Sequence, residues 1–286
     1  MVSTAEEKIS RAAQILKSSR HVLAFTGAGI SVESGIPPFR GPGGLYERVS
    51  PTIFDINYFL DEPEACWKLL IEHVLWPLLS AEPNPAHLVL ARLEKAGIIK
   101  AVITQNIDAL HKKAGSEKVI EFHGTADLME CLRCHTYFPP EKILPESFLT
   151  LTEKIRQKKS AAPADEIKAF FETFQVPRCP KCRGLIKPAI VFFGERIPEQ
   201  ALSESFQQAN QADCLLIVGT SGVVYPAAMI PQIARANQAQ IIEINTEPSE
   251  YTDSLSSIFI QSPASVALMA MERAIISLGG QPREKS

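Results

Sequence analysis

Short apolar runs recur along the 286-residue chain, and each leads into a turn of glycine or polar residues. The runs at 22–26, 98–103, 119–122, 213–218 and 240–244 are separated by segments with helical periodicity. Continuous apolar runs of this length are typical of parallel strands buried on both faces. The pattern predicts an α/β fold: a Rossmann-like parallel sheet of at least five strands with helices on both faces.

Helical patterns cover residues 3–18, 86–97 and 264–278. In the first, Ser3 and Glu6 have the spacing of a capping box. Residues 36–86 mix prolines, aromatic residues and short helical patterns, with Pro63 at the first turn of one helix. We interpret this stretch as a small helical module inserted after the first strand. Its aromatic side chains are predicted to form its core: Phe54, Tyr58, Phe59, Trp67 and Trp76.

The first apolar run ends in the turn Gly27, Ala28 and Gly29. A strand that feeds a helix through such a turn favours phosphate binding, because glycines allow close approach and the helix N-terminus offers free N–H groups. The dinucleotide fingerprint is incomplete, since Val32 occupies the third glycine position. An ordinary dehydrogenase is therefore disfavoured. Phe39 and Arg40, followed by a glycine-rich run, predict an additional cover over the ligand.

Polar side chains follow the second and third runs. Gln105, Asn106 and Asp108 come directly after one strand, and His123 comes after the next. The carboxyl ends of parallel strands are where α/β folds bind ligands. The alternative for Asn106 and Asp108 is that they cap the following helix. A lone histidine is usually structural, but its near-neutral pKa also suits a general base.

A second glycine-hydroxyl turn follows the fourth run, and Asn245 follows the fifth. Because these strand ends meet at one sheet edge, they predict a single cleft. We interpret Cys214 as a core residue, and we expect 186–195 to return to the main sheet or its edge. The turn comprises Gly219, Thr220, Ser221 and Gly222.

Two Cys-x-x-Cys pairs lie in the middle of the chain, Cys131 with Cys134 and Cys179 with Cys182. Four thiolates fill a tetrahedral zinc site and leave no position for water, so the pattern predicts structural zinc; an iron–sulfur cluster is the alternative. The stretch between the pairs is longer than in an ordinary zinc ribbon. We predict one or two helices there, joined by the loop 160–163.

Composition limits the choice of partners. A net charge of −3 gives no overall attraction to nucleic acid or membranes, and no apolar run approaches a membrane span. The charged N-terminus does not look like a secretory signal. Six cysteines without such a signal favour a reducing compartment, with the cytoplasm as the default expectation.

Taken together, the motifs resemble the sirtuin family, the NAD-dependent protein lysine deacylases. The resemblance extends over roughly residues 8–275 and rests on motifs in the family's order. They are the segments 27–31, 34–37 and 39–40, then 104–108, His123 with Gly124, the two cysteine pairs, 192–195, 219–221 and Asn245.

The resemblance implies three parts. Residues 1–35, 87–124 and 186–286 would form the Rossmann-type NAD-binding domain. Residues 36–86 would form the cofactor loop and helical module, and 125–185 the zinc-binding module. NAD, the co-substrate, would bind in the cleft between the domains.

The resemblance also implies roles for individual residues. His123 would deprotonate a ribose hydroxyl, Asn106 would orient that hydroxyl or a water, and Phe39 would shield the sugar. Asp108 and Ile107 would hold the nicotinamide carboxamide. The remaining cofactor-binding residues would be Gly27, Ala28, Gly29, Val32, Arg40, Gln105, Gly219, Thr220, Ser221, Asn245 and Ala264.

The acyl-lysine peptide would add a strand between Gly194–Glu195 and the segment of Val223, Val224 and Tyr225. The implied products are free lysine, nicotinamide and O-acyl-ADP-ribose. Mono-ADP-ribosyl transfer to protein and non-catalytic NAD or ADP-ribose binding are the alternatives.

The chain departs from the family pattern in four places. Pro38 stands where many members have Asp, and Gly222 where Leu is usual. Leu70 and His73 match positions that carry Tyr and Arg in members preferring succinyl or malonyl groups. A carboxylate would lack its guanidinium partner, so we predict uncharged acyl groups. The long segment between the cysteine pairs is the fourth departure.

Overall fold

The computed structural model describes residues 4–158 and 163–279 of the chain. Its main feature is a six-stranded parallel sheet with the strand order β3-β2-β1-β7-β8-β9. The fold class and the five expected strands are confirmed, and β9 is a further strand that the sequence reading did not predict. The strands are β1 (Val22–Thr26), β2 (Ile99–Thr104), β3 (Val119–Glu121), β7 (Cys214–Val218), β8 (Gln240–Asn245) and β9 (Ile258–Gln261).

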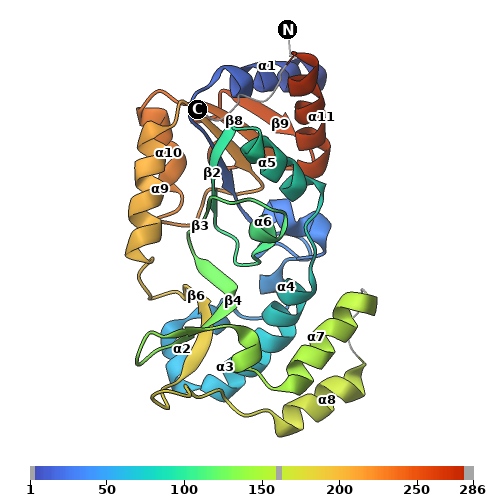
Figure 1. Cartoon of the computed structure of the whole chain (residues 1–286), viewed down its shortest axis with the longest axis vertical. Helices are drawn as coiled ribbons and strands as arrows, with labels where there is room; N and C mark the ends of the chain where they lie inside the picture. The colour runs from blue at the N-terminus through green and yellow to red at the C-terminus, as the bar shows by residue number, and fades with distance from the viewer. Residues whose placement is uncertain (1–3, 159–162, 280–286) are drawn as a thin grey trace.

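Apolar side chains cover both faces of this sheet. One face packs against α1 (Ala5–Ser18), α5 (Pro85–Lys95) and α11 (Ala264–Ser277). The other packs against α9 (Glu199–Gln211) and α10 (Met229–Ala236). Figure 1 shows the two groups of helices on opposite sides of the sheet. We call the sheet with these helices the sheet body.

The first helix begins one residue later than expected. Thr4 and Glu7 form the capping box: the Thr4 hydroxyl accepts from Glu7 N at 3.2 Å, and the Glu7 carboxylate accepts from Thr4 N at 2.8 Å. The predicted box of Ser3 and Glu6 is therefore wrong, and Ser3 itself lies outside the described residues. Both pairs have the same spacing, so the sequence pattern alone does not distinguish them.

A second, smaller sheet contains β4 (Gly124–Cys131), β5 (Tyr137–Phe138) and β6 (Ile186–Ile190), all antiparallel. The expectation that 186–195 returns to the main sheet is thus wrong for β6. Its apolar residues are buried against the helical module, where Trp67 Nε1 donates to Ile186 O at 3.1 Å. Burial by this module produces the same apolar pattern as burial in the main sheet.

The helical module contains α2 (Ile56–Asp61), α3 (Pro63–Leu70) and α4 (Trp76–Ser80), with a π-helical turn at Ile71–Leu75 before α4. Its predicted aromatic core is confirmed: Phe59 and Trp67 are fully buried, and Phe54 and Trp76 nearly so. Tyr58 is half-buried and packs against the same core. We call this module, the three-stranded sheet and the cysteine pairs the small body.

The segment between the cysteine pairs folds as two helices, α7 (Glu146–Lys158) and α8 (Ala164–Thr173). They pack on the start of α4, where the Trp76 ring lies 6.0 Å from Phe148 and 5.5 Å from Phe170. The prediction of helices is confirmed; of the predicted loop, residues 160–162 lie outside the described chain. Figure 1 shows α7 and α8 at the side of α4, and through these ring contacts the segment extends the aromatic core of the small body.

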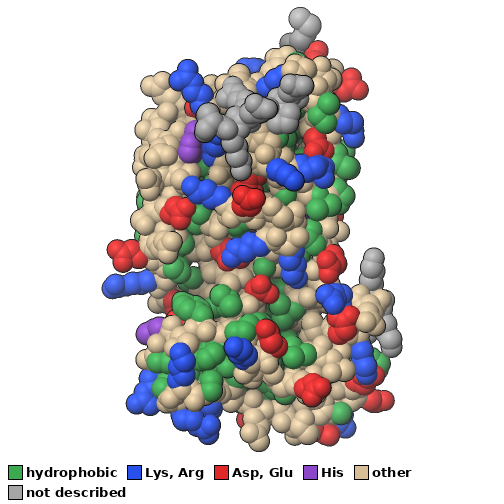
Figure 2. All heavy atoms as spheres, in the orientation of Figure 1, with side chains coloured by type: hydrophobic (Ala, Val, Ile, Leu, Met, Phe, Trp, Pro, Cys, Tyr) green, Lys and Arg blue, Asp and Glu red, His purple; other side chains and the backbone are tan. Residues whose placement is uncertain are grey.

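The remaining elements are short. A four-residue helix, α6, covers Leu110–Lys113. Turns of 3₁₀ helix cover Ala28–Ser34, Leu45–Glu47, Pro51–Phe54 and Pro140–Lys142. Within the described ranges, no helix has the length and apolar character needed to cross a membrane. Positive and negative side chains lie interspersed over most of the face drawn in Figure 2.

Candidate functional site

The two glycine turns of the sheet body pack directly against each other. Gly27 N donates to Val218 O at 3.0 Å, and Gly29 N donates to Gly219 O at 2.8 Å. A Cβ atom at Gly29 would lie 2.6 Å from Gly219 Cα, and one at Gly27 would lie 2.7 Å from Thr220 Cβ. The glycines are therefore required by the close approach of the two turns at the carboxyl edge of the sheet.

A cavity of about 920 Å³ opens at this edge. Its walls come from both bodies, and it has room for a dinucleotide-sized ligand. All but one of the sixteen predicted catalytic and cofactor-binding residues line it, Asp108 being the exception: Gly27, Ala28, Gly29, Val32, Phe39, Arg40, Gln105, Asn106, Ile107, His123, Gly219, Thr220, Ser221, Asn245 and Ala264.

A side pocket adjoins this cavity and shares Ala28, Phe39, Asn106 and Ile107 with it. Asp108 lines the side pocket and not the main cavity, and it lies there beside the predicted cofactor residues Ala28, Phe39 and Ile107, which line both. The opposite wall of the side pocket comes from the helical module: His73, Val74, Pro77 and Leu78.

Asn106 and Asp108 are held by a buried hydrogen-bond network. Ser31 Oγ donates to Asp108 Oδ2 at 2.6 Å, and Asn106 Nδ2 donates to Ser31 Oγ at 3.0 Å and to Gly27 O at 3.1 Å. Asp108 Oδ1 also accepts from Leu110 N at 2.9 Å. The capping alternative thus holds in part for Asp108, while Asn106 bonds to the first glycine turn. These contacts fix both side chains before any ligand arrives.

His123 follows β3 and faces the large cavity. Its Nδ1 lies 3.1 Å from Gln105 O, and because a carbonyl only accepts, Nδ1 carries the proton. The lone pair of Nε2 is then free in the neutral ring. Burial lowers the pKa of His123 below its usual range, and the Gln105 hydrogen bond partly opposes this shift. The ring is therefore neutral near pH 7 and able to accept a proton at Nε2.

Aromatic rings surround Phe39, which lines both the side pocket and the main cavity. Phe39 lies 5.7 Å from Tyr46 and 5.8 Å from Phe54 between ring centroids, and the Arg40 guanidinium lies 5.3 Å from the centre of the Tyr46 ring. Phe54 thus belongs to the module core, as predicted, and also lines the cavity. The cover predicted from Phe39 and Arg40 is held in place by the helical module.

The residues predicted for the peptide lie beside the cavity but do not line it. Tyr225 and Val223 are exposed, and the immediate neighbours Phe193 and Val224 form part of the cavity wall. Gly194 has a φ of +91°. The Glu195 carboxylate turns inward, accepting from Phe192 N at 2.8 Å and pairing with Lys187 Nζ at 3.1 Å. Any contact from Glu195 to a ligand would therefore come from its backbone.

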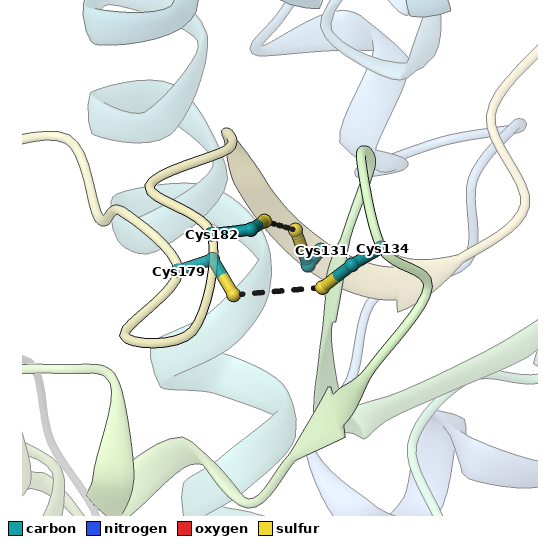
Figure 3. Close-up of side chains that lie close together, drawn as sticks. All are labelled: Cys131, Cys134, Cys179 and Cys182. Carbon is teal, nitrogen blue, oxygen red and sulfur yellow. Dashed lines mark hydrogen bonds between the residues drawn. The ribbon is translucent and has the colours of Figure 1, made fainter.

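The four predicted metal ligands meet in the small body (Figure 3). The Sγ atoms of Cys131, Cys134, Cys179 and Cys182 all lie within 4.8 Å of one another. Two of the separations are 3.4 Å and 3.7 Å, close to the ~3.8 Å between sulfurs of a tetrahedral zinc site with Zn–S bonds near 2.3 Å. The donor set and its spacing fit a Zn²⁺ ion.

Sequence reasoning missed Ser31 as the centre of the network and His87 behind it. His87 Nε2 lies 3.4 Å from Ser31 Oγ, and its ring packs on His111 with centroids 4.9 Å apart. Ser31 stands inside the first glycine motif, which was the available signal. His87 lies in a helix far along the chain and has no distinguishing local pattern.

The facing glycine turns, the polar strand ends and the large cavity define a nucleotide-binding protein with a Rossmann-type sheet. Comparison with known proteins specifies the family. The family model described as "Sir2 family" matches residues 27–226, and the chain belongs to this family, the sirtuins.

Several relatives and solved structures are similar over most of their length. An NAD-dependent protein deacetylase from Caldivirga maquilingensis is 43% identical over 258 residues, covering 90% of both chains. An NAD-dependent protein deacylase from Archaeoglobus fulgidus is 42% identical, covering 85% of this chain and 87% of its own. A structure of Sir2 bound to acetylated peptide is 33% identical with a TM-score of 0.76, covering 95% and 98%. A Sir2 homologue–NAD complex is 32% identical with a TM-score of 0.78, covering 94% of each.

Proposed function

We propose that the chain is an NAD-dependent protein lysine deacylase acting on acetyl-lysine, which transfers the acyl group to ADP-ribose and releases nicotinamide and O-acetyl-ADP-ribose. The observation that carries the proposal is the free Nε2 of His123 in the same cavity as the two glycine turns. A neutral base beside a nucleotide site is the arrangement that this reaction needs.

The sheet body would hold NAD. Backbone groups of Gly27, Ala28, Gly29 and Gly219, with the hydroxyls of Thr220 and Ser221, would bind the phosphates. Asn245 lines the cavity, where its side chain donates to Thr220 O at 2.8 Å, and it would contact the adenosine ribose. Val32, Arg40, Gln105 and Ala264 would complete these walls. When bound, NAD supplies a ribose carbon that becomes electrophilic as nicotinamide leaves.

The side pocket would receive the nicotinamide carboxamide. Asp108 and Ile107 would bind it, and the Ser31 hydroxyl keeps the Asp108 carboxylate in place. Phe39 would close the pocket against water and returning nicotinamide. An amide oxygen is a weak nucleophile, so holding the reacting groups in the right geometry must supply much of the reduction in the activation barrier.

His123 would act as the general base toward a ribose hydroxyl, with Asn106 orienting that hydroxyl or a water. Because Nδ1 is committed to Gln105 O, the proton would move to Nε2. A positioned base of this kind contributes about 10²–10⁴-fold to a rate.

The substrate peptide would lie between the backbone of Gly194–Glu195 and that of Val223 and Tyr225, adding one strand. Leu70 is buried in the module core and His73 lines the side pocket, so no guanidinium is available from these two positions. Uncharged acyl groups are therefore the proposed substrates.

Zinc would be structural and would join the two cysteine pairs of the small body. We also propose that 1–35, 87–124 and 186–286 act as the NAD-binding domain, with 36–86 and 125–185 as the modules that cover it. The reducing compartment in which these thiolates would persist is proposed to be the cytoplasm.

A panel of peptides tests the proposal. Acetyl-lysine peptide and NAD should give nicotinamide and O-acetyl-ADP-ribose in equal amounts, while succinyl-lysine peptide should react far more slowly. Mass spectrometry would detect both products. Radiolabelled protein without deacetylated peptide would establish ADP-ribosyl transfer in its place, and NAD binding without turnover would establish a binding protein; either result would overturn the proposal.

A further inference from the structure

Glu243 places a carboxylate on an otherwise apolar face of the main sheet. It lies in β8, where its backbone is paired with Ile217 of β7 and Phe259 of β9, and it is fully buried. Burying an ionised carboxylate costs several kcal/mol unless hydrogen bonds replace its water. The residue therefore needs dedicated partners, and the proposed mechanism gives it no part.

Three hydroxyl groups supply those partners, and all come from the loop between β8 and β9. Ser249 Oγ donates to Oε1 at 2.5 Å, and Ser256 Oγ donates to Oε2 at 2.6 Å. Thr252 Oγ1 lies 3.1 Å and 3.0 Å from the two oxygens. Each oxygen thus faces two hydroxyls, and one carboxylate fixes three points along the loop.

The same loop lines the cavity and contacts the second glycine turn. Thr246, Glu247 and Pro248 form part of the cavity wall directly after Asn245. Further along, Glu250 N donates to Ser221 O at 3.1 Å. The loop therefore connects two walls of the cavity, one at the end of β7 and one at the end of β8.

Gly222 and Tyr251 complete this connection. Gly222 has a φ of +79°, and a Cβ atom there would lie 2.8 Å from Cζ of the buried Tyr251 ring. This accounts for glycine where the family pattern usually has Leu. The departure allows the loop to pack closely against the turn.

We propose that Glu243 is a positioning residue for the adenosine half of the NAD site: through Ser249, Thr252 and Ser256 it holds the 246–256 loop against the second glycine turn. The inference rests on the proposed NAD site. In this proposal the loop contributes to the affinity for the cofactor, and other residues carry out the chemical step.

Glu243→Leu, Glu243→Gln and Ser256→Ala test the proposal by calorimetric titration with ADP-ribose and by steady-state kinetics. Glu243→Leu removes the acceptor for all three hydroxyls. It should raise the Kd for ADP-ribose and the KM for NAD about tenfold, equivalent to about 1.4 kcal/mol. The kcat at saturating NAD and the KM for peptide should stay within about twofold of wild type.

Glu243→Gln keeps the shape and can still accept from the loop, so it should recover most of the affinity. Ser256→Ala removes one donor and should weaken ADP-ribose binding about threefold. Ser277→Ala is the matched control: its exposed hydroxyl donates to Ala274 O at 2.8 Å in α11, outside the loop, so its Kd should equal that of wild type.

A folded Glu243→Leu protein with an unchanged Kd for ADP-ribose would overturn the inference, even if its melting temperature were lower. If Glu243→Leu does not fold, an unchanged Kd in Ser256→Ala has the same meaning. Failure of the proposed function gives a different result, because wild type would then bind ADP-ribose without deacylating peptide.

Discussion

The sheet body and the small body reach stability in different ways. In the sheet body, adjacent parallel strands of apolar residues pack between two layers of helices, and the polar residues that line the cavity follow the strand ends. In the small body, a cysteine cluster, an aromatic core and buried Lys187 hold three short strands and several helices together. The regular body carries the candidate chemistry, while the irregular body covers it and forms the outer wall of the side pocket.

The largest expected effect tests whether the chemistry lies in the sheet body. His123→Ala should lower kcat for acetyl-lysine peptide by about 10²–10⁴-fold because it removes the general base. ADP-ribose affinity, measured by calorimetry, should change by less than about threefold. His135→Ala, at an exposed position in the small body, is the control and should keep full activity. Unchanged turnover in His123→Ala would refute the mechanism.

The next effect concerns the small body. Cys179→Ser should abolish stoichiometric zinc, measured by atomic absorption, and destabilise the small body by several kcal/mol because ligand binding and folding are coupled. Circular dichroism should retain the helical signal of the sheet body. Cys214→Ala, a substitution in the sheet core, should keep one zinc per chain. A folded, zinc-free and fully active Cys179→Ser protein would contradict the assignment.

Gly29→Ala tests the contact between the two glycine turns. Its Cβ would meet Gly219 Cα at 2.6 Å, so we expect a loss of about 1–3 kcal/mol in unfolding free energy and a higher Kd for ADP-ribose. Gly97→Ala is the comparison: φ is +75° and nothing lies within 4 Å, so it adds strain without a clash. It should lower stability and leave the Kd unchanged. Equal Kd values for both variants would exclude a role for the close approach.

The smallest effect is a pH dependence of stability in the sheet body. Burial lowers the pKa of His87 to about 4 and that of His111 well below its usual range. In the unfolded chain both titrate near ~6.5. Below that pH the unfolded state takes up protons that the folded state excludes, so stability falls as pH drops from about 6.5 toward 4 and is flat above it.

Urea midpoints at pH 5 and pH 7.5 measure this slope. His87→Gln should reduce the difference between the two pH values relative to wild type. A difference equal to that of wild type would show that His87 does not contribute.

The sequence predicted the sheet body better than the small body for a physical reason. A strand buried between helices must be apolar along its length, so β1, β2, β7 and β8 are visible as patterns. β9 is short, its alternate residues Phe259 and Gln261 are less buried, and it was missed. β6 is also largely buried, but its partner is the antiparallel β4, and the local sequence does not report the partner.

The candidate site was predicted where a motif and a strand end coincide, as for His123 and the glycine turns. Ser31, His87 and Glu243 act through contacts with residues distant in sequence, and only the folded chain brings those partners together. Asp108 was singled out by its place after a strand end, but the side pocket that it lines also needs a wall from the helical module, which the local sequence does not report.

The strand order has a consequence for synthesis on the ribosome. β1 lies inside the sheet between β2 and β7. The edge of β1 that faces β7 therefore stays unpaired until β7, which begins at Cys214, has been synthesised. The whole small body is synthesised in that interval and can close its own antiparallel contacts first. The nucleotide cavity is completed only after β8 emerges with Asn245, so a nascent chain halted before that point should contain a formed zinc module and no cofactor affinity.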